Sequence, residues 1–264
     1  MRKFPSRLRT KKLIVFDLDG TLAPSKSRMD GGMSALLAEL LEKRKIAVIG
    51  GGRYAQFQKQ FLRSVRAPRQ LLPRLFLFPT TSTAFYRYRG GWRRVYEKKF
   101  SRREKRKIFS AFARMFRELA YAHPKRTYGP ILEDRGTQIT FSALGQDVVA
   151  RLGPRGVRRK ADWKRKHDAL RRTMMRRLQA LLPEFSVRVG GLTSIDVTRK
   201  GIDKAYGIRQ IRRVLKIPLR EMLFVGDALY PGGNDYAVRR TGVSWVQVRG
   251  PEETKRVIRF LLSG

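Results

Sequence analysis

The chain has no cysteine and only two histidines, His123 and His167, among its 264 residues. The absence of cysteine excludes disulfides, thiolate zinc sites and thiol catalysis, and it agrees with a reducing compartment. Two histidines are too few for a histidine-rich metal site. A metal centre built mainly from cysteine or histidine ligands is therefore excluded.

Long apolar runs are also missing from the sequence. The basic start, MRKFPSRLRTKK, is followed by only four apolar residues before Asp17. Such a run is too short for the core of a signal peptide or for a membrane span. We therefore expect a cytoplasmic protein with no membrane partner.

Acidic side chains are few, because 21 Asp and Glu stand against 60 Lys and Arg and give a formal net charge of +39. A field of this sign attracts nucleic acid, anionic lipid or small phosphorylated molecules. The basic residues are spread over nearly every segment, so we favour a solvated basic surface. Nucleic-acid binding stays open as an alternative. The aromatic and basic stretch 85–96 fits a stacking platform for bases, but we favour a half-buried strand pair.

Both ends of the chain carry the pattern of a parallel α/β sheet. Short apolar segments at 12–17, 46–52, 222–227 and 243–248 are typical of buried parallel strands. Apolar residues at helical spacing in 33–44 predict a helix between the first two strands. Alternating strands and helices indicate a Rossmann-like, doubly wound sheet.

The middle of the chain has the pattern of a separate α+β unit. Mixed or alternating strands and amphipathic helices are predicted at 92–100, 101–121, 137–144, 159–183, 185–191 and 193–197. We therefore expect an inserted α+β domain at 82–198, which splits the core domain into residues 1–81 and 199–264. The length of the chain suits this organisation.

Two acidic residues lie at the ends of predicted core strands. Asp17 ends the strand in LIVFDLDGTL, and Asp227 ends the strand MLFVGD. Because the carboxyl ends of parallel strands line one crevice, the two carboxylates converge there. A divalent cation such as Mg²⁺, which prefers oxygen ligands, would offset their repulsion. Asp235, in the turn PGGND beside Asn234, is a further candidate ligand.

A second carboxylate, Asp19, follows Asp17 after one residue and projects to the same side once the chain turns at Gly20. This geometry suits a nucleophile beside a general acid or base. Lys204, in the segment KGIDKAYGI, supplies positive charge to the site. Asp203, just before it, is expected to cap the following helix.

Three segments together, FDLDGTL, GIDK and VGDALYPGGND, resemble the first, third and fourth motifs of the haloacid dehalogenase superfamily of aspartyl-phosphate enzymes. The position of the insert is similar to that of the Cof-like, type IIB cap domain. The fourth motif and the segments 133–146 and 190–207 resemble eukaryotic-type phosphomannomutases. The resemblance therefore covers most of the chain.

The resemblance implies a role for each acidic residue of the motifs. By it, Asp17 is the nucleophile, Asp19 is the acid/base, and Lys204 anchors the phosphate and the nucleophile. Asp227 and Asp235 are the carboxylates that bind Mg²⁺, and Asp19 adds its backbone carbonyl to the metal.

Two positions depart from the family pattern. The second motif of the family ends a strand with Ser or Thr, whereas this chain has Gly51, Gly52 and Arg53, whose backbone N–H groups or guanidinium are candidate substitutes. Gln146 stands where the mutases carry a cap arginine that contacts phosphate, while Arg135 matches another cap arginine. A mutase needs phosphate ligands on both cap and core, so the loss of one favours a hydrolase.

We therefore expect a Mg²⁺-dependent phosphatase that acts through an aspartyl-phosphate on a small phosphorylated metabolite, with a hexose phosphate as the favoured substrate. A phosphomannomutase-like mutase is the alternative, and a nucleic-acid-binding protein on a phosphatase scaffold is the second alternative. A monomer and a cap-mediated homodimer are both compatible with the sequence. Asp196 is either a ligand of a substrate hydroxyl or the cap of a turn. The further candidates for binding phosphate or substrate are Leu18, Gly20, Thr21 and Asn234.

Overall fold

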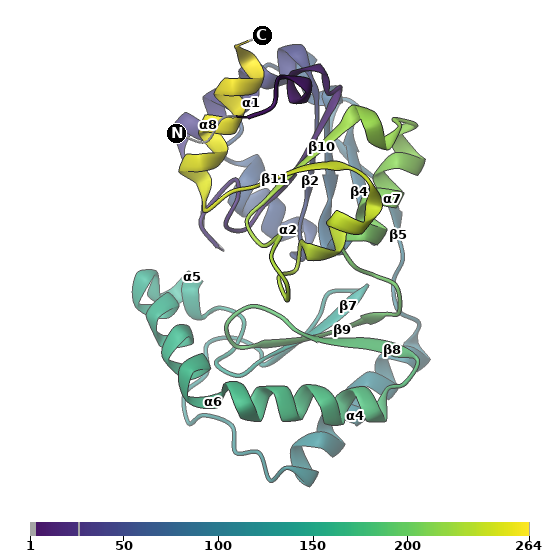
Figure 1. Ribbon diagram of the computed structural model, residues 1–264. Helices are drawn as coiled ribbons and strands as arrows, with labels where there is room; N and C mark the ends of the chain where they lie inside the picture. The colour runs from purple at the N-terminus through teal and green to yellow at the C-terminus, as the bar shows by residue number, and fades with distance from the viewer. Residues whose placement is uncertain (1–3, 26, 264) are drawn as a thin grey trace. The chain divides into compact units, whose positions relative to one another are not determined.

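The computed structural model describes residues 4–25 and 27–263, and the chain divides into two compact units (Figure 1). One unit, which we call the core unit, comprises Met1–Glu97 and Ile202–Gly264. The other, the cap unit, comprises Lys98–Gly201. Within the described ranges, no helix has both the length and the apolar character needed to span a membrane.

A seven-stranded sheet in the order β11-β10-β1-β2-β3-β4-β5 lies at the centre of the core unit. Its first five strands in this order are parallel, and β4 and β5 extend it as an antiparallel hairpin. The strands are β1 (Leu13–Asp17), β2 (Lys45–Ile49), β3 (Leu75–Phe78), β4 (Ala84–Tyr88), β5 (Trp92–Glu97), β10 (Met222–Gly226) and β11 (Ser244–Gln247).

Helices cover both faces of this sheet, which explains why its central strands are apolar along their whole length. Ile14 and Phe16 of β1 belong to one apolar cluster, whereas Leu13 and Val15 belong to another on the opposite face. Helices α1 (Gly31–Lys43) and α8 (Pro251–Leu262) pack in the first cluster, and α7 (Lys204–Leu215) packs in the second (Figure 1). The Rossmann-like fold class expected from the sequence is thus confirmed.

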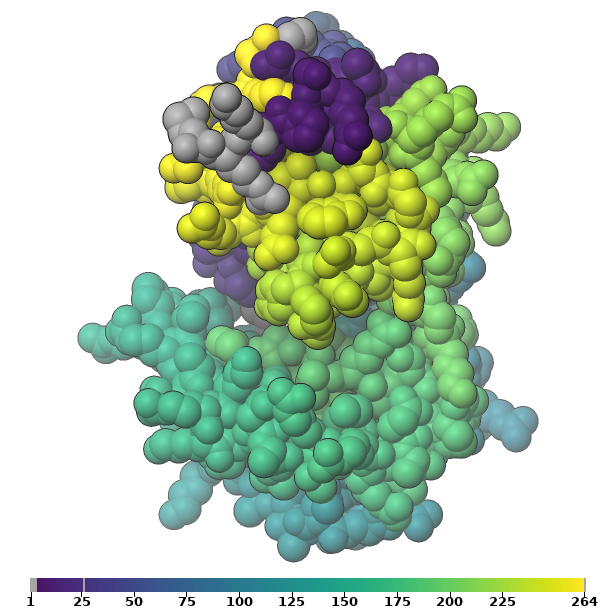
Figure 2. All heavy atoms as spheres, in the orientation of Figure 1, coloured from purple at the N-terminus to yellow at the C-terminus, as the bar shows by residue number. Residues whose placement is uncertain are grey.

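Short helical segments complete the core unit. They are η1 (Ser6–Thr10), α2 (Tyr54–Phe57), the π-helical turn η2 (Gln58–Leu62), η3 (Arg69–Arg74), α3 (Pro79–Ser82), η4 (Leu219–Glu221) and η5 (Tyr236–Thr241). The segment η1, in purple, packs on α8, in yellow (Figure 2). Here Arg9 Nε donates to the Phe260 carbonyl at 3.1 Å. Asp203 caps α7 as expected, since its side chain accepts a hydrogen bond from the Tyr206 N–H at 2.8 Å.

The cap unit is built on a four-stranded antiparallel sheet in the order β6-β7-β9-β8. Its elements are α4 (Arg102–Glu118), β6 (Leu132–Asp134), β7 (Gln138–Ser142), α5 (Val148–Leu152), α6 (Pro154–Leu181), β8 (Phe185–Val189) and β9 (Ser194–Arg199). One face of this sheet, with Phe141 and Ile195, packs against Phe112 of α4 and Met174 of α6 in a single apolar cluster. Polar side chains occupy the other face.

The expected start of the insert, residue 82, is wrong. Strands β4 and β5 pair with β3 in the sheet of the core unit, so the second unit begins at Lys98 and ends at Gly201. Phe85 of β4 stacks on Phe78 of β3 with ring centroids 4.6 Å apart, which holds the hairpin in the core unit. The half-buried strand pair expected at 85–96 is this hairpin.

Candidate active site

Adjacent parallel strands position the two acidic residues that the sequence placed at strand ends. Asp17 is the last residue of β1, and Asp227 directly follows β10, which pairs with β1. Asp235 lies in the loop after Asp227 and is fully buried. One carboxylate oxygen from each of the three residues lies within 4.8 Å of the other two. The fold therefore brings together the three carboxylates that the sequence indicated.

Lys204, the first residue of α7, joins this group through its ammonium. Its Nζ donates to Asp17 Oδ1 and, at 2.7 Å, to Asp235 Oδ1. Burial alone would lower the pKa of Lys204, but the charges of Asp17 and Asp235 raise it above its ordinary value. The side chain is therefore a charged ammonium held between two buried carboxylates.

The donor set fits a hard divalent cation. Asp17 Oδ2 is buried and has no hydrogen-bond partner among the described residues, and the same holds for Thr21 Oγ1. Burial raises the pKa of Asp17 well above its ordinary value, while burial and the charge of Asp235 raise the pKa of Asp227 to about 6. These shifts indicate that the positive charge around the carboxylates is too small to offset their burial and mutual repulsion. A Mg²⁺ ion, which prefers carboxylate oxygen, would supply that charge.

The turn after β1 brings the chain close to Asp227. Gly20 has a φ of +82°, and a Cβ at this position would lie 2.4 Å from Asp227 Oδ2. Its N–H donates to the Ala23 carbonyl at 2.8 Å, which closes the turn. Leu18, within the same segment, is buried. Any side chain at residue 20 would therefore displace one of the clustered carboxylates.

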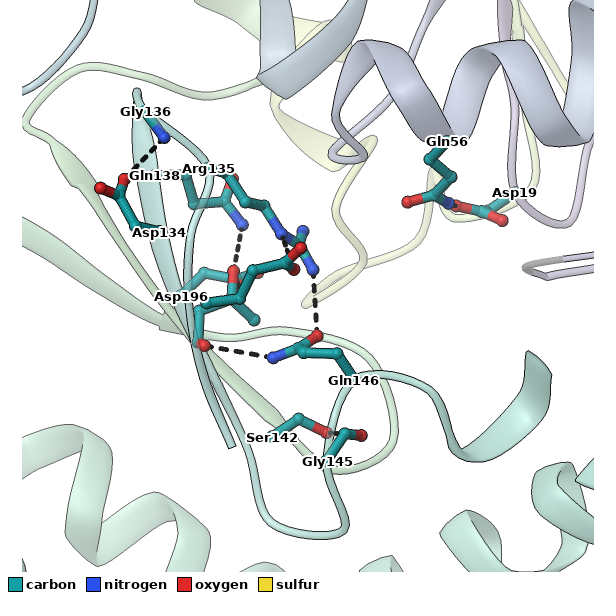
Figure 3. Close-up of polar contacts among 12 residues, drawn as sticks. Asp19, Gln56, Asp134, Arg135, Gly136, Gln138, Ser142, Gly145, Gln146 and Asp196 are labelled. Atoms are coloured by element: carbon teal, nitrogen blue, oxygen red, sulfur yellow. Dashed lines mark hydrogen bonds and ion pairs between the residues drawn. The ribbon is translucent and has the colours of Figure 1, made fainter. Parts of the chain in front are cut away.

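Two glutamines that the sequence did not indicate hold Asp19. Gln60 Nε2 donates to Asp19 Oδ1 at 2.8 Å. Gln56 Nε2 lies 3.3 Å from Asp19 Oδ2, and Figure 3 shows these two side chains next to each other. Gln56 Nε2 also donates to Gln60 Oε1 at 3.0 Å, so the two amides brace each other. The sequence did contain one signal for this pair. The two amides are four residues apart in a helical segment that follows a glycine-rich strand end, so they lie on one face of it.

The loop after β2, where the family has its second motif, leaves room for the contact between Gln56 and Asp19. A Cβ at Gly52 would lie 2.3 Å from Gln56 Oε1, so the glycine leaves room for the amide beside Asp19. The N–H of Thr80 donates to the Gly52 carbonyl at 2.9 Å. A Cβ at Gly51 would meet nothing within 4 Å, and Arg53 is an exposed residue at the start of α2. Asn234 is likewise exposed, next to buried Asp235.

Three other candidate residues lie in the cap unit (Figure 3). Asp196 is the third residue of β9 and accepts a hydrogen bond from Thr140 Oγ1 at 2.8 Å, so the alternative that it caps a turn is wrong. Arg135 donates through Nε to Glu133 at 2.8 Å and through Nη2 to Gln146 Oε1 at 3.2 Å. Gln146 is thus a brace for Arg135.

Comparisons with known proteins agree with this geometry. The profile of the eukaryotic phosphomannomutase family matches residues 33–263. The phosphomannomutase of Encephalitozoon cuniculi is 27% identical over 253 residues, which cover 94% of this chain and 92% of that protein. The phosphomannomutase of Saccharomyces cerevisiae is 24% identical over 270 residues, with coverages of 99% and 98%.

Solved structures show the same fold at low sequence identity. The IMP-bound IMP-nucleotidase of Plasmodium falciparum, in N-terminally truncated form, matches with a TM-score of 0.68 at 15% identity, over 97% of this chain and 70% of that one. A haloacid dehalogenase-like hydrolase from Bacteroides thetaiotaomicron matches with a TM-score of 0.61 at 13% identity, over 94% of this chain and 98% of that one.

Proposed function

Because the chain belongs to the eukaryotic phosphomannomutase family of the haloacid dehalogenase superfamily, we propose that it moves a phosphoryl group on a hexose phosphate as a phosphomannomutase-like mutase. The two curated relatives described above are phosphomannomutases that align with this chain over more than nine-tenths of their length. This similarity favours the mutase over the hydrolase that the sequence suggested. A phosphatase with the same nucleophile is the alternative.

The observation that carries the proposal is the buried cluster of Asp17, Asp227 and Asp235 around Lys204. The ammonium holds one oxygen of Asp17 and neutralises part of the charge that would repel a phosphate. The other oxygen, Oδ2, makes no hydrogen bond within the described ranges and is available to attack phosphorus. This attack would break the bond to the leaving oxygen and form an aspartyl-phosphate on Asp17.

A magnesium ion would be held by Asp17, Asp227 and Asp235, with the backbone carbonyl of Asp19, and would offset charge on the transferring phosphoryl group. Asp19 would give a proton to the leaving sugar oxygen and then take one from the accepting hydroxyl. The amides of Gln56 and Gln60 fix both oxygens of Asp19, which keeps the carboxyl oriented for these two proton transfers.

The test uses mannose 1-phosphate and Mg²⁺, with and without a hexose bisphosphate activator. We expect mannose 6-phosphate to form and the bisphosphate to increase its rate of formation. Release of inorganic phosphate without any isomer would refute the mutase proposal and support the alternative that the protein is a phosphatase. Asp17→Asn is expected to abolish both products, whereas the matched change Asp162→Asn, at an exposed position of α6, should leave them unchanged.

A nucleic-acid-binding role rests on the basic charge and on the aromatic stretch 85–96, which forms the β4–β5 hairpin. The cap unit carries 27 Lys and Arg against 9 Asp and Glu, so both domains share the basic excess. Titration with single-stranded and duplex oligonucleotides over a salt series tests this alternative, because counterion release makes such binding steeply salt-dependent. The cytoplasmic location and the choice between monomer and cap-mediated homodimer also stay predictions.

A further inference from the structure

Three consecutive residues after β3 have a left-handed backbone. Thr80, Thr81 and Ser82 have φ values of 48°, 54° and 64°. The Cβ atom makes this conformation unfavourable, and residues other than glycine adopt it singly rather than in runs. Two of the three residues are threonines, whose branched Cβ adds to the crowding. A strained run of this kind persists only where the surrounding structure determines it, and such strain is concentrated at functional sites.

One side of this turn holds the loop after β2. The N–H of Thr80 donates to the Gly52 carbonyl, and the N–H of Thr81 donates to the Gly50 carbonyl, each at 2.9 Å. Both bonds use backbone groups that the left-handed conformation presents side by side. Gly52 is the glycine whose missing side chain leaves room for the Gln56 amide. The turn therefore determines where this amide lies.

The other side of the turn packs on α7. Ser82 is fully buried, and a Cβ at Gly207 would lie 3.0 Å from Ser82 Oγ, so the helix and the turn are in close contact. Tyr96 Oη of β5 donates to the Ser82 carbonyl at 3.0 Å, which ties the end of the turn to the sheet. Gly207 is three residues after Lys204, the first residue of α7. The turn thus lies between the loop after β2 and the end of α7 that carries the ammonium.

We propose that the turn Thr80–Ser82 is a positioning element of the active site. It holds the loop Gly50–Gly52 and the first turn of α7 in one arrangement, and it thereby fixes Gln56 and Lys204 relative to the carboxylates. The three residues act through these neighbours and not on the substrate. The inference rests on the proposed function for the reaction that is measured, and it gives the strained backbone a role that an unstrained turn with several conformations would not fill.

The test relieves the strain at Thr81. Thr81→Gly accepts the left-handed conformation but is also free to adopt others, so the urea midpoint should rise while kcat for isomer formation falls about 10-fold and KM stays within about twofold. Thr81→Asn tolerates the left-handed region and stays more restricted than glycine, so kcat should be retained within about twofold. Lys216→Gly is the matched control, because it relieves a φ of 53° at the far end of α7 and should raise the urea midpoint without a change in kcat.

NMR of the Gln56 side-chain amide in metal-free protein gives a second readout, which does not depend on turnover, and Gln56→Leu assigns its signal. The signal should split or broaden in Thr81→Gly and match the wild type in Thr81→Asn and Lys216→Gly. A kcat equal to that of the wild type, or a single sharp signal in Thr81→Gly, overturns the inference and leaves the proposed function standing. A wild type that forms no isomer refutes the proposed function, and the amide signal then decides the inference. If Thr81→Gly does not fold, Tyr96→Phe, which removes the donor to the Ser82 carbonyl, carries the same comparison.

Discussion

Replacing Lys204 by methionine keeps the length of the side chain and removes the ammonium that donates to Asp17 and Asp235. All three side chains are at most 3% exposed, so the two carboxylates lose their partner inside the protein. Removing one member of a buried ion pair costs about 3–5 kcal/mol. Burial already raises the pKa of Asp17, and uptake of a proton would relieve part of the cost, which places the expected loss in free energy of unfolding at about 3–4 kcal/mol.

The assay is urea unfolding followed by circular dichroism, with EDTA present and then with Mg²⁺. Asp17→Asn and the double variant with Lys204→Met complete a cycle. Lys204→Met should cost less in the Asp17→Asn background, because one of the stranded carboxylates is gone. Added Mg²⁺ should restore part of the stability of Lys204→Met. A single variant that unfolds within about 1 kcal/mol of the wild type in EDTA would refute the buried, charged state of Lys204.

Three further predictions test the surroundings of the site. Gln60→Leu removes the hydrogen bond to Asp19 Oδ1, so kcat for isomer formation should fall about 10- to 100-fold in steady-state assays, whereas Gln58→Leu at an exposed position should not change it. Ser82→Gly relieves a φ of 64° and removes a buried hydroxyl that has no partner in the described part of the chain. Urea unfolding should show a gain of about 1 kcal/mol, and Ser82→Ala, which keeps the strained φ, should gain less. In metal-free protein, the folded pKa of Asp227, about 6, exceeds that of an unfolded carboxyl, so the folded state binds more protons between pH 4 and 6. Stability therefore falls as pH rises through this window, by about 1–2 kcal/mol after solvent screening, and comparison with Asp227→Asn isolates the effect; equal pH profiles would contradict it.

The central strands were predictable because they are buried on both faces, which leaves a continuous apolar run in the sequence. Strand β3 was missed, since Leu75–Phe78 is only four residues long and lies directly before Pro79. The hairpin β4–β5 was recognised as strands but assigned to the wrong sheet. Half-buried antiparallel strands have the same pattern in either domain, and only the tertiary stacking of Phe85 on Phe78 decides between them.

The carboxylates of the site were predictable for a different reason. Charged residues at the ends of apolar strands stand out, and the topology of parallel sheets brings such ends together. Gln56 and Gln60 carry no charge, and the π-helical turn that includes Gln60 changes which residues face the site. The sequence suggested Gly52 as a phosphate ligand but did not indicate that its missing side chain leaves space for Gln56. The neutral support of Asp19 thus depends on packing that sequence patterns do not record.

The balance between hydrolase and mutase depends on the whole polar face of the cap, and one position does not decide it. Gln146 accepts from Arg135 and donates to the Thr140 carbonyl at 3.2 Å, so the amide braces the sheet where a second arginine would repel the first. A mutase must hold its sugar in two orientations, with either phosphate away from the nucleophile. Because Gln146 holds Arg135 in place, the absence of an arginine at residue 146 does not by itself favour a hydrolase.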